Sequence, residues 1–394
     1  MQKCSYFYLY RCKRAVFSKI TALLQDSPPM GGFGQEITVL LQDGVRMLPA
    51  LPLFLPASTP PSFLDTPEGN GYTQTNTGTA ATETDTIQPQ GGFAMNNLPD
   101  EQTLHTIAQA NAKRQVVLPD GITLPQLGQG TWNMGDNAAK RKEELETLRL
   151  GVELGMTFLD TAEMYGDGKA EELVGEAIQG IRDKVFLVTK VYPHNAGGAR
   201  LDRSCEASLK RLGTDRLDLY LLHWRGSIPL EETVEGMEKL VRQGKIARWG
   251  VSNLDTSDMR ELLALTGGTG CAVNQVLYHL GSRGIEYDLM PLQESKGIPV
   301  MAYCPLAQGG RLRKGLIAHP AVQAVAQRHR ATPLQVLLAW CIRSGNTLAI
   351  PKASTARHVV ENAAAAALEL TPEDLAELDR AFPAPSRKVP LDVV

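Results

Sequence analysis

The chain has 394 residues, of which 43% are hydrophobic and 21% are charged. This balance supports a sizeable core and excludes a chain that is disordered throughout. The 40 basic and 43 acidic residues give a net charge of −3, and only 6% of the residues are aromatic. Because nucleic-acid binding needs a basic field or a base-stacking surface, we expect no nucleic-acid partner.

Cysteine and histidine form no metal or disulfide pattern. The six cysteines have irregular spacings without C-x-x-C, and the seven histidines include no H-x-x-x-H pair. We therefore expect reduced, mostly buried thiols and no metal site. The most apolar run, residues 47–57, contains three prolines and is shorter than the ~20 residues of a membrane helix. We expect a cytoplasmic protein with no membrane contact.

The first 114 residues differ in composition from the rest. Residues 58–92 are rich in Ser, Thr, Pro, Gly, Asn and Gln and hold few charges. Such a stretch buries too little apolar area to offset the entropy of ordering it. We predict that residues 1–114 are a largely disordered or mis-annotated N-terminal extension with a short helix near residues 99–112. Met30, Met47 and Met95 are candidate internal starts.

From residue 115 the pattern becomes periodic. Segments 116–118 and 122–124 flank Pro119-Asp120-Gly121, which predicts a β-hairpin. Short apolar segments then alternate with longer segments of helical period. The predicted strands are 126–130, 157–160, 185–190, 217–222, 246–251, 272–275, 299–303 and 347–350. The predicted helices are 140–154, 170–179, 199–212, 230–243, 256–265, 289–295, 320–343 and 355–367.

Eight strand–helix units over roughly 250 residues are the number expected for a closed barrel. We predict an α/β fold, a (β/α)₈ TIM barrel with an N-terminal hairpin, formed by residues 115–394. The alternative is a doubly wound open sheet, which would place a glycine-rich turn after its first strand. Gly128-Gln129-Gly130 is the early candidate for that turn, but no third glycine follows at the required place.

Polar residues follow several predicted strands where catalytic groups of such barrels lie. Asp160, Lys190 and His223 end three of the strands, and Tyr165 follows Asp160 closely. An ammonium group beside a phenol lowers its pKa, and a carboxylate keeps that ammonium charged. Tyr165 is then a proton donor, and Lys190 adjusts its pKa. Asp160 orients Lys190, and His223 donates a hydrogen bond to a carbonyl oxygen. These groups suit carbonyl reduction by a hydride-carrying cofactor.

Each residue alone has a simpler explanation. Asp160 could cap a turn, Lys190 could be a solvated strand end, His223 a satisfied core histidine, and Tyr165 a packed loop residue. Their occurrence at successive strand ends favours one shared site.

The strings around these residues resemble the aldo-keto reductase superfamily, over about two-thirds of the chain. Within that family they look closest to bacterial methylglyoxal reductases. The resemblance is carried by Phe158-Leu159-Asp160-Thr161-Ala162 with Tyr165-Gly166, Lys190, Leu221-Leu222-His223-Trp224, Gly250-Val251-Ser252-Asn253, Gln275 to Gly284, Ile350-Pro351-Lys352 with Glu361-Asn362, and Ala381 to Pro385.

The resemblance implies an NADPH-dependent reductase with the tetrad Asp160, Tyr165, Lys190 and His223. It also implies a set of cofactor contacts running from the nicotinamide to the adenine. These are Ser252, Asn253 and Gln275 at the carboxamide, Tyr303 stacked on the nicotinamide, Pro305 and Leu306 along the pyrophosphate, Lys352, Thr355, Arg357 and His358 at the 2′-phosphate, and Glu361 and Asn362 at the adenine.

Three positions depart from the family pattern. Cys304 and Ala353 stand where serines are usual, so two hydroxyl contacts are absent. His358 stands where an arginine is usual, and a histidine is mostly neutral at pH 7. We still expect a preference for NADPH over NADH, through Lys352 and Arg357.

We expect Trp132, Tyr192 and Trp224 to wall a pocket suited to small aldehydes and dicarbonyls, in a monomeric enzyme. Methylglyoxal, reduced to hydroxyacetone, is the preferred substrate. One alternative is a non-catalytic, nicotinamide-binding regulatory subunit. Another is a Schiff-base aldolase that uses Lys190, which pairing with Asp160 disfavours because a protonated lysine is not nucleophilic.

Overall fold

The computed structural model describes residues 98–394 except residue 309, so the predicted disorder of residues 58–92 and the candidate starts lie outside the described residues. The predicted helix near residues 99–112 is confirmed as α2 (Glu101–Lys113). The Asp100 side chain caps it by accepting from the backbone N–H of Thr103 at 2.8 Å. Helix α2 docks on the rest of the fold through Asn111, whose amide donates to the carbonyl of Ala363 at 2.9 Å.

Eight parallel strands form the central sheet in the order in which they occur along the chain, from β3 to β10. They are β3 (Gln129–Gly130), β4 (Phe158–Asp160), β5 (Phe186–Val191), β6 (Leu219–Leu222), β7 (Trp249–Ser252), β8 (Cys271–Leu277), β9 (Val300–Tyr303) and β10 (Thr347–Ala349). The first and last strands meet, because Gly128 N donates to Ala349 O at 2.9 Å and Ala349 N donates to Gln126 O at 2.7 Å. The predicted (β/α)₈ barrel is therefore confirmed, and the open sheet is excluded.

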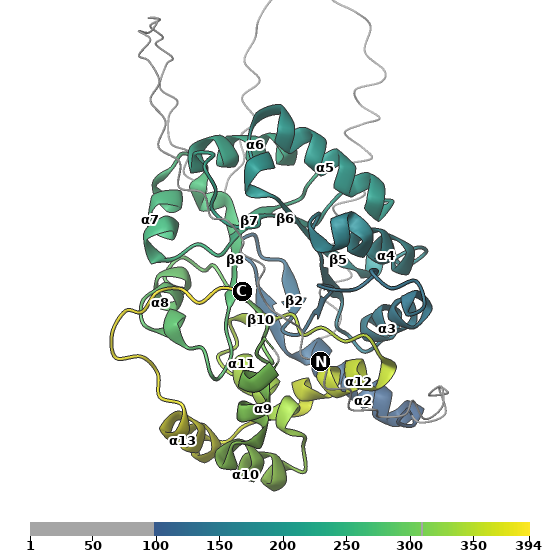
Figure 1. Ribbon diagram of the computed structural model, residues 1–394, viewed down its shortest axis with the longest axis vertical. Helices are drawn as coiled ribbons and strands as arrows, with labels where there is room; N and C mark the ends of the chain where they lie inside the picture. The colour runs from purple at the N-terminus through teal and green to yellow at the C-terminus, as the bar shows by residue number, and fades with distance from the viewer. Residues whose placement is uncertain (1–97, 309) are drawn as a thin grey trace, which may run out of the picture. The chain divides into compact units, whose positions relative to one another are not determined.

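Helices surround the strands (Figure 1). They are α3 (Arg141–Glu153), α4 (Lys169–Ala177), α5 (Gly198–Leu212), α6 (Leu230–Arg242), α7 (Thr256–Ala264), α8 (Leu289–Glu294), α9 (Gly310–Ala318), α10 (Pro320–His329), α11 (Pro333–Cys341), α12 (Ala356–Ala364) and α13 (Pro372–Ala381). Among the residues that the structure describes, no helix has both the length and the apolar character needed to cross a bilayer.

The single helix predicted over residues 320–343 is wrong, since two helices occupy this range. Arg330 ends α10 in the left-handed conformation, with φ of 52°. Thr332 then begins α11 with a capping box, in which its hydroxyl accepts from Gln335 N and the Gln335 side chain accepts from Thr332 N. Pro333 is the first residue of α11, because a proline has no backbone N–H to offer to a preceding helical turn.

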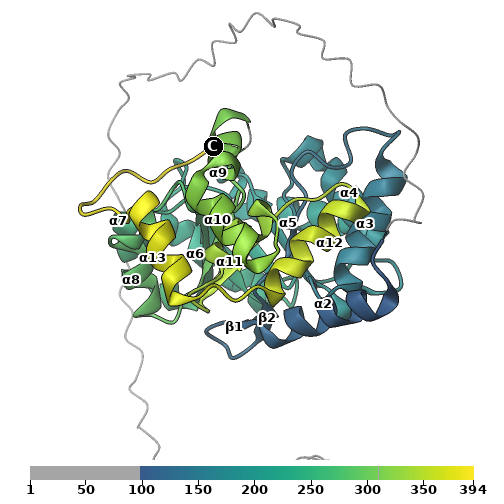
Figure 2. The same cartoon turned by 90° about the horizontal axis from the view of Figure 1, so that it is seen from below.

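The predicted hairpin is confirmed as β1 (Gln115–Val117) paired with β2 (Thr123–Pro125). Its turn includes Gly121 at φ of 85°, a conformation that glycine adopts without strain. The buried side chains of the hairpin join the apolar cluster inside the barrel. Figure 2 shows the hairpin and α2 at one end of the barrel, opposite α9 and the C-terminal residues.

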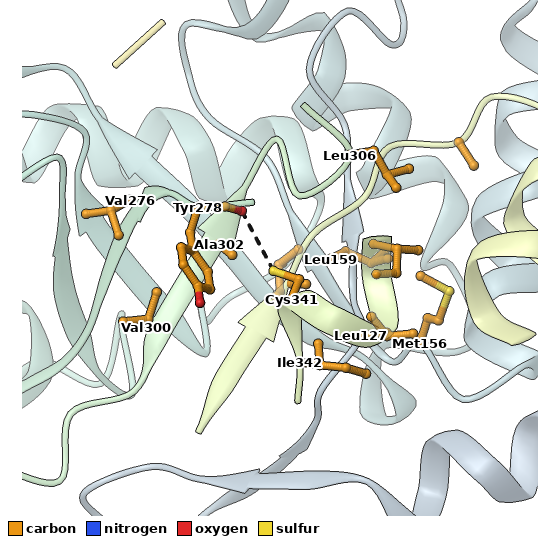
Figure 3. Close-up of a cluster of buried hydrophobic side chains, with 14 of the residues drawn as sticks. Leu127, Met156, Leu159, Val276, Tyr278, Val300, Ala302, Leu306, Cys341 and Ile342 are labelled. Atoms are coloured by element: carbon orange, nitrogen blue, oxygen red, sulfur yellow. Dashed lines mark hydrogen bonds between the residues drawn. The ribbon is translucent and has the colours of Figure 1, made fainter. Parts of the chain in front are cut away.

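Strand side chains alternate between two apolar layers. Outward-facing residues such as Leu159 and Val276 pack against the helices, and Figure 3 shows part of this layer, including the contact from the Cys341 thiol to the Tyr278 carbonyl. Inward-facing residues such as Phe158, Val188 and Val273 fill the barrel interior. Two residues further along these three strands the inward positions are the buried polar residues Asp160, Lys190 and Gln275, and this change marks the site.

Candidate active site

A cavity of about 340 Å³ opens at the carboxyl ends of the strands. Its floor is built from inward-facing strand residues and from the segments that follow the strands. Asp160, Tyr165, His223, Ser252 and Gln275 all line it. Among the described residues, no group of three or more His, Cys, Asp or Glu side chains is placed to hold a metal ion.

Lys190 lies beneath the cavity lining, where it contacts the two lining residues Asp160 and Tyr165. Its ammonium group donates to Asp160 Oδ2 at 2.7 Å, to the carbonyl of Thr161 at 2.9 Å and to the Tyr165 hydroxyl at 3.2 Å. Lys190 is 0% exposed and Asp160 is 1% exposed. The three hydrogens of the ammonium group therefore each have an acceptor, and the pair is held in one geometry.

Tyr165 is placed by a tight turn that follows β4. The turn contains Gly166 at φ of 58°, and a Cβ atom there would lie 2.2 Å from Asp136 Oδ1. Glycine adopts this left-handed conformation without strain, so it suits the turn that places Tyr165.

Burial dominates the electrostatics of this group. It raises the pKa of Asp160 and lowers the pKa of Lys190, and their mutual attraction opposes both changes. Burial, then the negative charge of Asp160, raises the pKa of Tyr165 well above its ordinary value. The expectation of a lowered pKa for Tyr165 is therefore not met: the Lys190 ammonium group is in place, but burial of the phenol and the Asp160 charge raise the pKa.

His223 is a neutral imidazole. Burial, with a smaller contribution from the Lys190 charge, lowers its pKa to about 2. Its ring lies edge-on to Tyr165 with centroids 5.7 Å apart and lies 4.9 Å from the ring of Trp224. Its Nδ1 atom is buried without a hydrogen-bond partner among the described residues. A neutral ring in this place can donate one hydrogen bond to a ligand in the cavity.

Ser252, Asn253 and Gln275 form a polar slot beside the tetrad. Asn253 is fully engaged, because its Oδ1 accepts from the Tyr303 hydroxyl at 2.9 Å and its Nδ2 donates to Ser252 Oγ at 3.2 Å. The Nε2 of Gln275 donates to Asp160 Oδ1 at 2.8 Å. One donor, the Ser252 hydroxyl, and one acceptor, Gln275 Oε1, are left, and this pair is complementary to an amide group.

The other predicted cofactor residues fall into two groups. Tyr303, Pro305, Leu306 and Lys352 line the cavity, as predicted for a path along a bound dinucleotide. The rest lie outside the cavity lining, on or beside α12. They are Thr355, which caps α12 by accepting from His358 N, the exposed Arg357 and His358, the partly buried Glu361 and the buried Asn362.

The predicted substrate walls are only partly reproduced. Trp132 and Trp224 line the cavity and are 47% and 38% exposed. Tyr192 does not line it. Its ring stacks on His194 at 4.9 Å and meets Trp224 edge-on at 6.1 Å, so it supports a wall residue instead of forming the wall.

Arg313 of α9 lines the cavity and escaped the sequence analysis, which expected no helix there. Its guanidinium group donates to the carbonyls of Leu306 and Ala307 at 2.9 and 2.8 Å. It thereby ties α9 to the segment after β9. No periodic pattern distinguishes it from neighbouring basic residues, so only the fold reveals its place.

Comparisons with known proteins agree with this geometry. Residues 126–382 match the Aldo/keto reductase family. Methylglyoxal reductase YeaE of Escherichia coli (strain K12) is 58% identical over 282 residues, covering 72% of this chain and 99% of that protein. Glyoxal reductase of Bacillus subtilis (strain 168) is 32% identical over 270 residues, covering 68% and 92%.

Solved structures give the same result. The crystal structure of an aldo/keto reductase from Klebsiella pneumoniae in complex with NADP and acetate has a TM-score of 0.70 and 58% identity, covering 71% of this chain and 99% of that one. The chain belongs to the aldo/keto reductase family.

Proposed function

We propose that the protein reduces aldehydes and 2-oxoaldehydes to alcohols with NADPH, using Tyr165 as the proton donor. The observation that carries this proposal is the position of the Lys190 ammonium group, which hydrogen-bonds both the Asp160 carboxylate and the Tyr165 hydroxyl directly beneath the cavity that these two residues line. The same cavity offers the amide-complementary pair of Ser252 and Gln275.

The residues present fit a nicotinamide dinucleotide phosphate. NADPH, with which relatives have been crystallised, supplies the hydride when bound. The Ser252 hydroxyl would donate to the carboxamide oxygen, and Gln275 Oε1 would accept from its nitrogen. Lys352 and the N-terminus of α12 suit the 2′-phosphate, because a cation and unpaired backbone N–H groups attract an anion.

The remaining cofactor contacts carry over from the resemblance. Tyr303 is assigned to the face of the nicotinamide ring. The hydrogen bond from its hydroxyl to Asn253 Oδ1 holds the Tyr303 ring in place. Pro305 and Leu306 are assigned to the pyrophosphate. Glu361 and Asn362 of α12 are assigned to the adenine.

The four tetrad residues have different roles in proton transfer. The carbonyl oxygen lies between the Tyr165 hydroxyl and the neutral imidazole of His223, and Tyr165 delivers its proton to that oxygen. A high pKa does not prevent this step, since the alkoxide formed is a stronger base than a phenolate. Lys190 stabilises the resulting phenolate, and Asp160 keeps Lys190 charged.

The substrate class follows from the walls and the relatives. Trp132 and Trp224 give the cavity apolar, partly exposed walls, and the volume suits small carbonyl compounds. We assign methylglyoxal, reduced to hydroxyacetone, as the substrate because the chain is 58% identical to a methylglyoxal reductase.

A spectrophotometric assay tests the proposal. NADPH consumption should be fastest with methylglyoxal and other small 2-oxoaldehydes in a panel of carbonyl compounds. NADPH binding without turnover of any carbonyl would instead support the regulatory-subunit alternative. Schiff-base chemistry is disfavoured by the geometry, because every hydrogen of the Lys190 ammonium group has an acceptor.

A further inference from the structure

We propose that Gln275 is a positioning residue for the proton donor, Tyr165. Gln275 holds the Asp160–Lys190 pair in its charged form, and it also binds the nicotinamide carboxamide. This inference rests on the proposed function, because it concerns the same site. Its new element is the link between the nicotinamide slot and the tetrad, made through one buried amide.

The contacts of Gln275 place it next to the tetrad. It lies on β8, is 2% exposed, and its Nε2 donates to Asp160 Oδ1 at 2.8 Å. Asp160 Oδ2 accepts from Lys190 at 2.7 Å. Each carboxylate oxygen therefore has one donor, and the amide supplies one of the two. The same Nε2 atom also lies 2.9 Å from Met301 Sδ.

Asp160 determines which way the Gln275 amide points. A flipped amide would place Oε1 against the Asp160 carboxylate, where two acceptors would repel each other. With Nε2 turned toward Asp160 and Met301, Oε1 is the atom left for the cavity, where it accepts from a carboxamide nitrogen. The orientation of the carboxamide and the state of Asp160 are thus coupled through one side chain.

A buried carboxyl–ammonium pair can be charged or neutral without any change in its total number of protons. The neutral form arises when the proton moves from Lys190 to Asp160. Burial favours this neutral form, and a hydrogen bond to the carboxylate opposes it. A neutral Lys190 could no longer stabilise the phenolate of Tyr165. By keeping Lys190 charged, Gln275 therefore supports proton donation by Tyr165.

Other charged groups near the pair do not replace Gln275. Lys190 of β5 and Tyr165 face Asp160, and the neutral His223 lies at the end of β6. Glu171 of α4 acts on Lys190 from behind the strand and is itself paired with Arg211 at 2.6 Å. None of these supplies a second hydrogen-bond donor to Asp160 Oδ1.

The test compares Gln275→Leu with the matched control Ser252→Ala, which removes a carboxamide contact but does not touch Asp160. Both variants should weaken NADPH binding, measured by fluorescence titration. In Gln275→Leu, kcat should also fall about tenfold, and in this variant alone the loss of kcat toward low pH should move up by about one pH unit, as expected for a lost bond to a charged group. Equal pH profiles in Gln275→Leu, Ser252→Ala and wild type would restrict Gln275 to the cofactor.

A second variant keeps the shape of the side chain and covers the case in which Gln275→Leu does not fold. In Gln275→Glu the introduced carboxylic acid can donate to Asp160 while protonated and repels it once ionised. We expect kcat of Gln275→Glu to fall as pH rises through the titration of this introduced acid. In Gln275→Leu, by contrast, kcat falls toward low pH. A profile identical to that of wild type would overturn the inference.

A measurement on the cofactor-free protein separates this inference from the proposed function. The side-chain amide resonances of Gln275, assigned by their loss in Gln275→Leu, should shift in Asp160→Asn and stay in place in Ser252→Ala. If they do so while no carbonyl is reduced, the contact stands and the proposed function fails. If wild type is an active reductase but Asp160→Asn leaves the resonances unmoved, the inference alone fails.

Discussion

The two ends of the proposed cofactor site differ in their exposure to water. At the barrel floor, Asp160, Lys190 and Gln275 are buried, and Lys190 and Gln275 both donate hydrogen bonds to Asp160. At the start of α12, Arg357 and His358 are exposed. Buried groups are held in one geometry and interact strongly, which chemistry needs, whereas exposed charges are screened by solvent and salt. Substitutions at the floor should therefore change rate, and substitutions near α12 should change cofactor affinity.

The largest effect is expected for Tyr165→Phe at the floor. The substitution removes the proton donor and keeps the ring, so kcat should fall by roughly 10²–10⁴-fold while the Kd for NADPH changes little. Tyr192→Phe is the matched control, because Tyr192 lies outside the cavity lining and should keep kcat near that of wild type. Unchanged turnover in Tyr165→Phe would remove this residue from the mechanism.

The floor also determines how the rate depends on pH. His223 has a pKa of about 2 and stays neutral at ordinary pH, and the raised pKa of Tyr165 keeps its proton in place. The group that changes state on the acid side is Asp160, whose pKa burial raises above the ordinary value of 3.8, so protonation releases Lys190 at a higher pH than usual. We expect kcat to be flat around neutral pH, to fall toward acid, and to fall again toward alkaline pH, where Lys190, whose pKa burial lowers, loses its charge. A kcat that stays constant from acid to alkaline pH would contradict this assignment.

The sequence predicted the barrel and the tetrad because both depend on local patterns. Eight alternating segments determine the fold class, and Asp160, Lys190 and His223 each follow an apolar strand. The pKa of Tyr165 could not be predicted, because it depends on how much water the folded site excludes. The contact from Gln275 to Asp160 joins residues 115 positions apart, so no local pattern reveals it.

The extent of the helices was predicted less well than that of the strands. Thr332 and Pro333 carry the start signals of α11, yet apolar periodicity alone joined α10 and α11 into one segment. Helix α9 has Leu316 as its one buried residue and so lacked a periodic apolar face to detect. Arg313 was missed for the same reason, since its role depends on a helix that the pattern did not show.

Near α12, Lys352→Met tests whether affinity is separate from rate. Removing a cation that meets the 2′-phosphate should raise the KM for NADPH about tenfold and leave kcat nearly unchanged. The difference from wild type should shrink as salt is added, because an exposed charge is screened. A fall in kcat equal to the rise in KM would show that this end of the site also takes part in the chemistry.

A smaller effect is expected for His358→Arg. The residue is exposed at the first turn of α12, and arginine supplies a permanent positive charge there. The ratio of kcat/KM for NADPH to that for NADH should rise roughly threefold, the size expected for one exposed ion pair. Arg357→His is the converse variant and should lower the ratio. Insensitivity of the ratio to both changes would place the 2′-phosphate elsewhere.

The smallest effect is expected for a chain that starts at Met95. Within residues 98–394, apart from residue 309, the cavity lining begins at Gly130, and α2 with its cap at Asp100 is retained, so kcat and KM should stay within about twofold of the full chain. A chain that starts at Gln115 provides the contrast. It loses the bond from Asn111 to Ala363, which anchors α2 on α12, and should unfold several degrees lower. Loss of activity in the Met95 chain would instead assign residues 1–94 a part in the site.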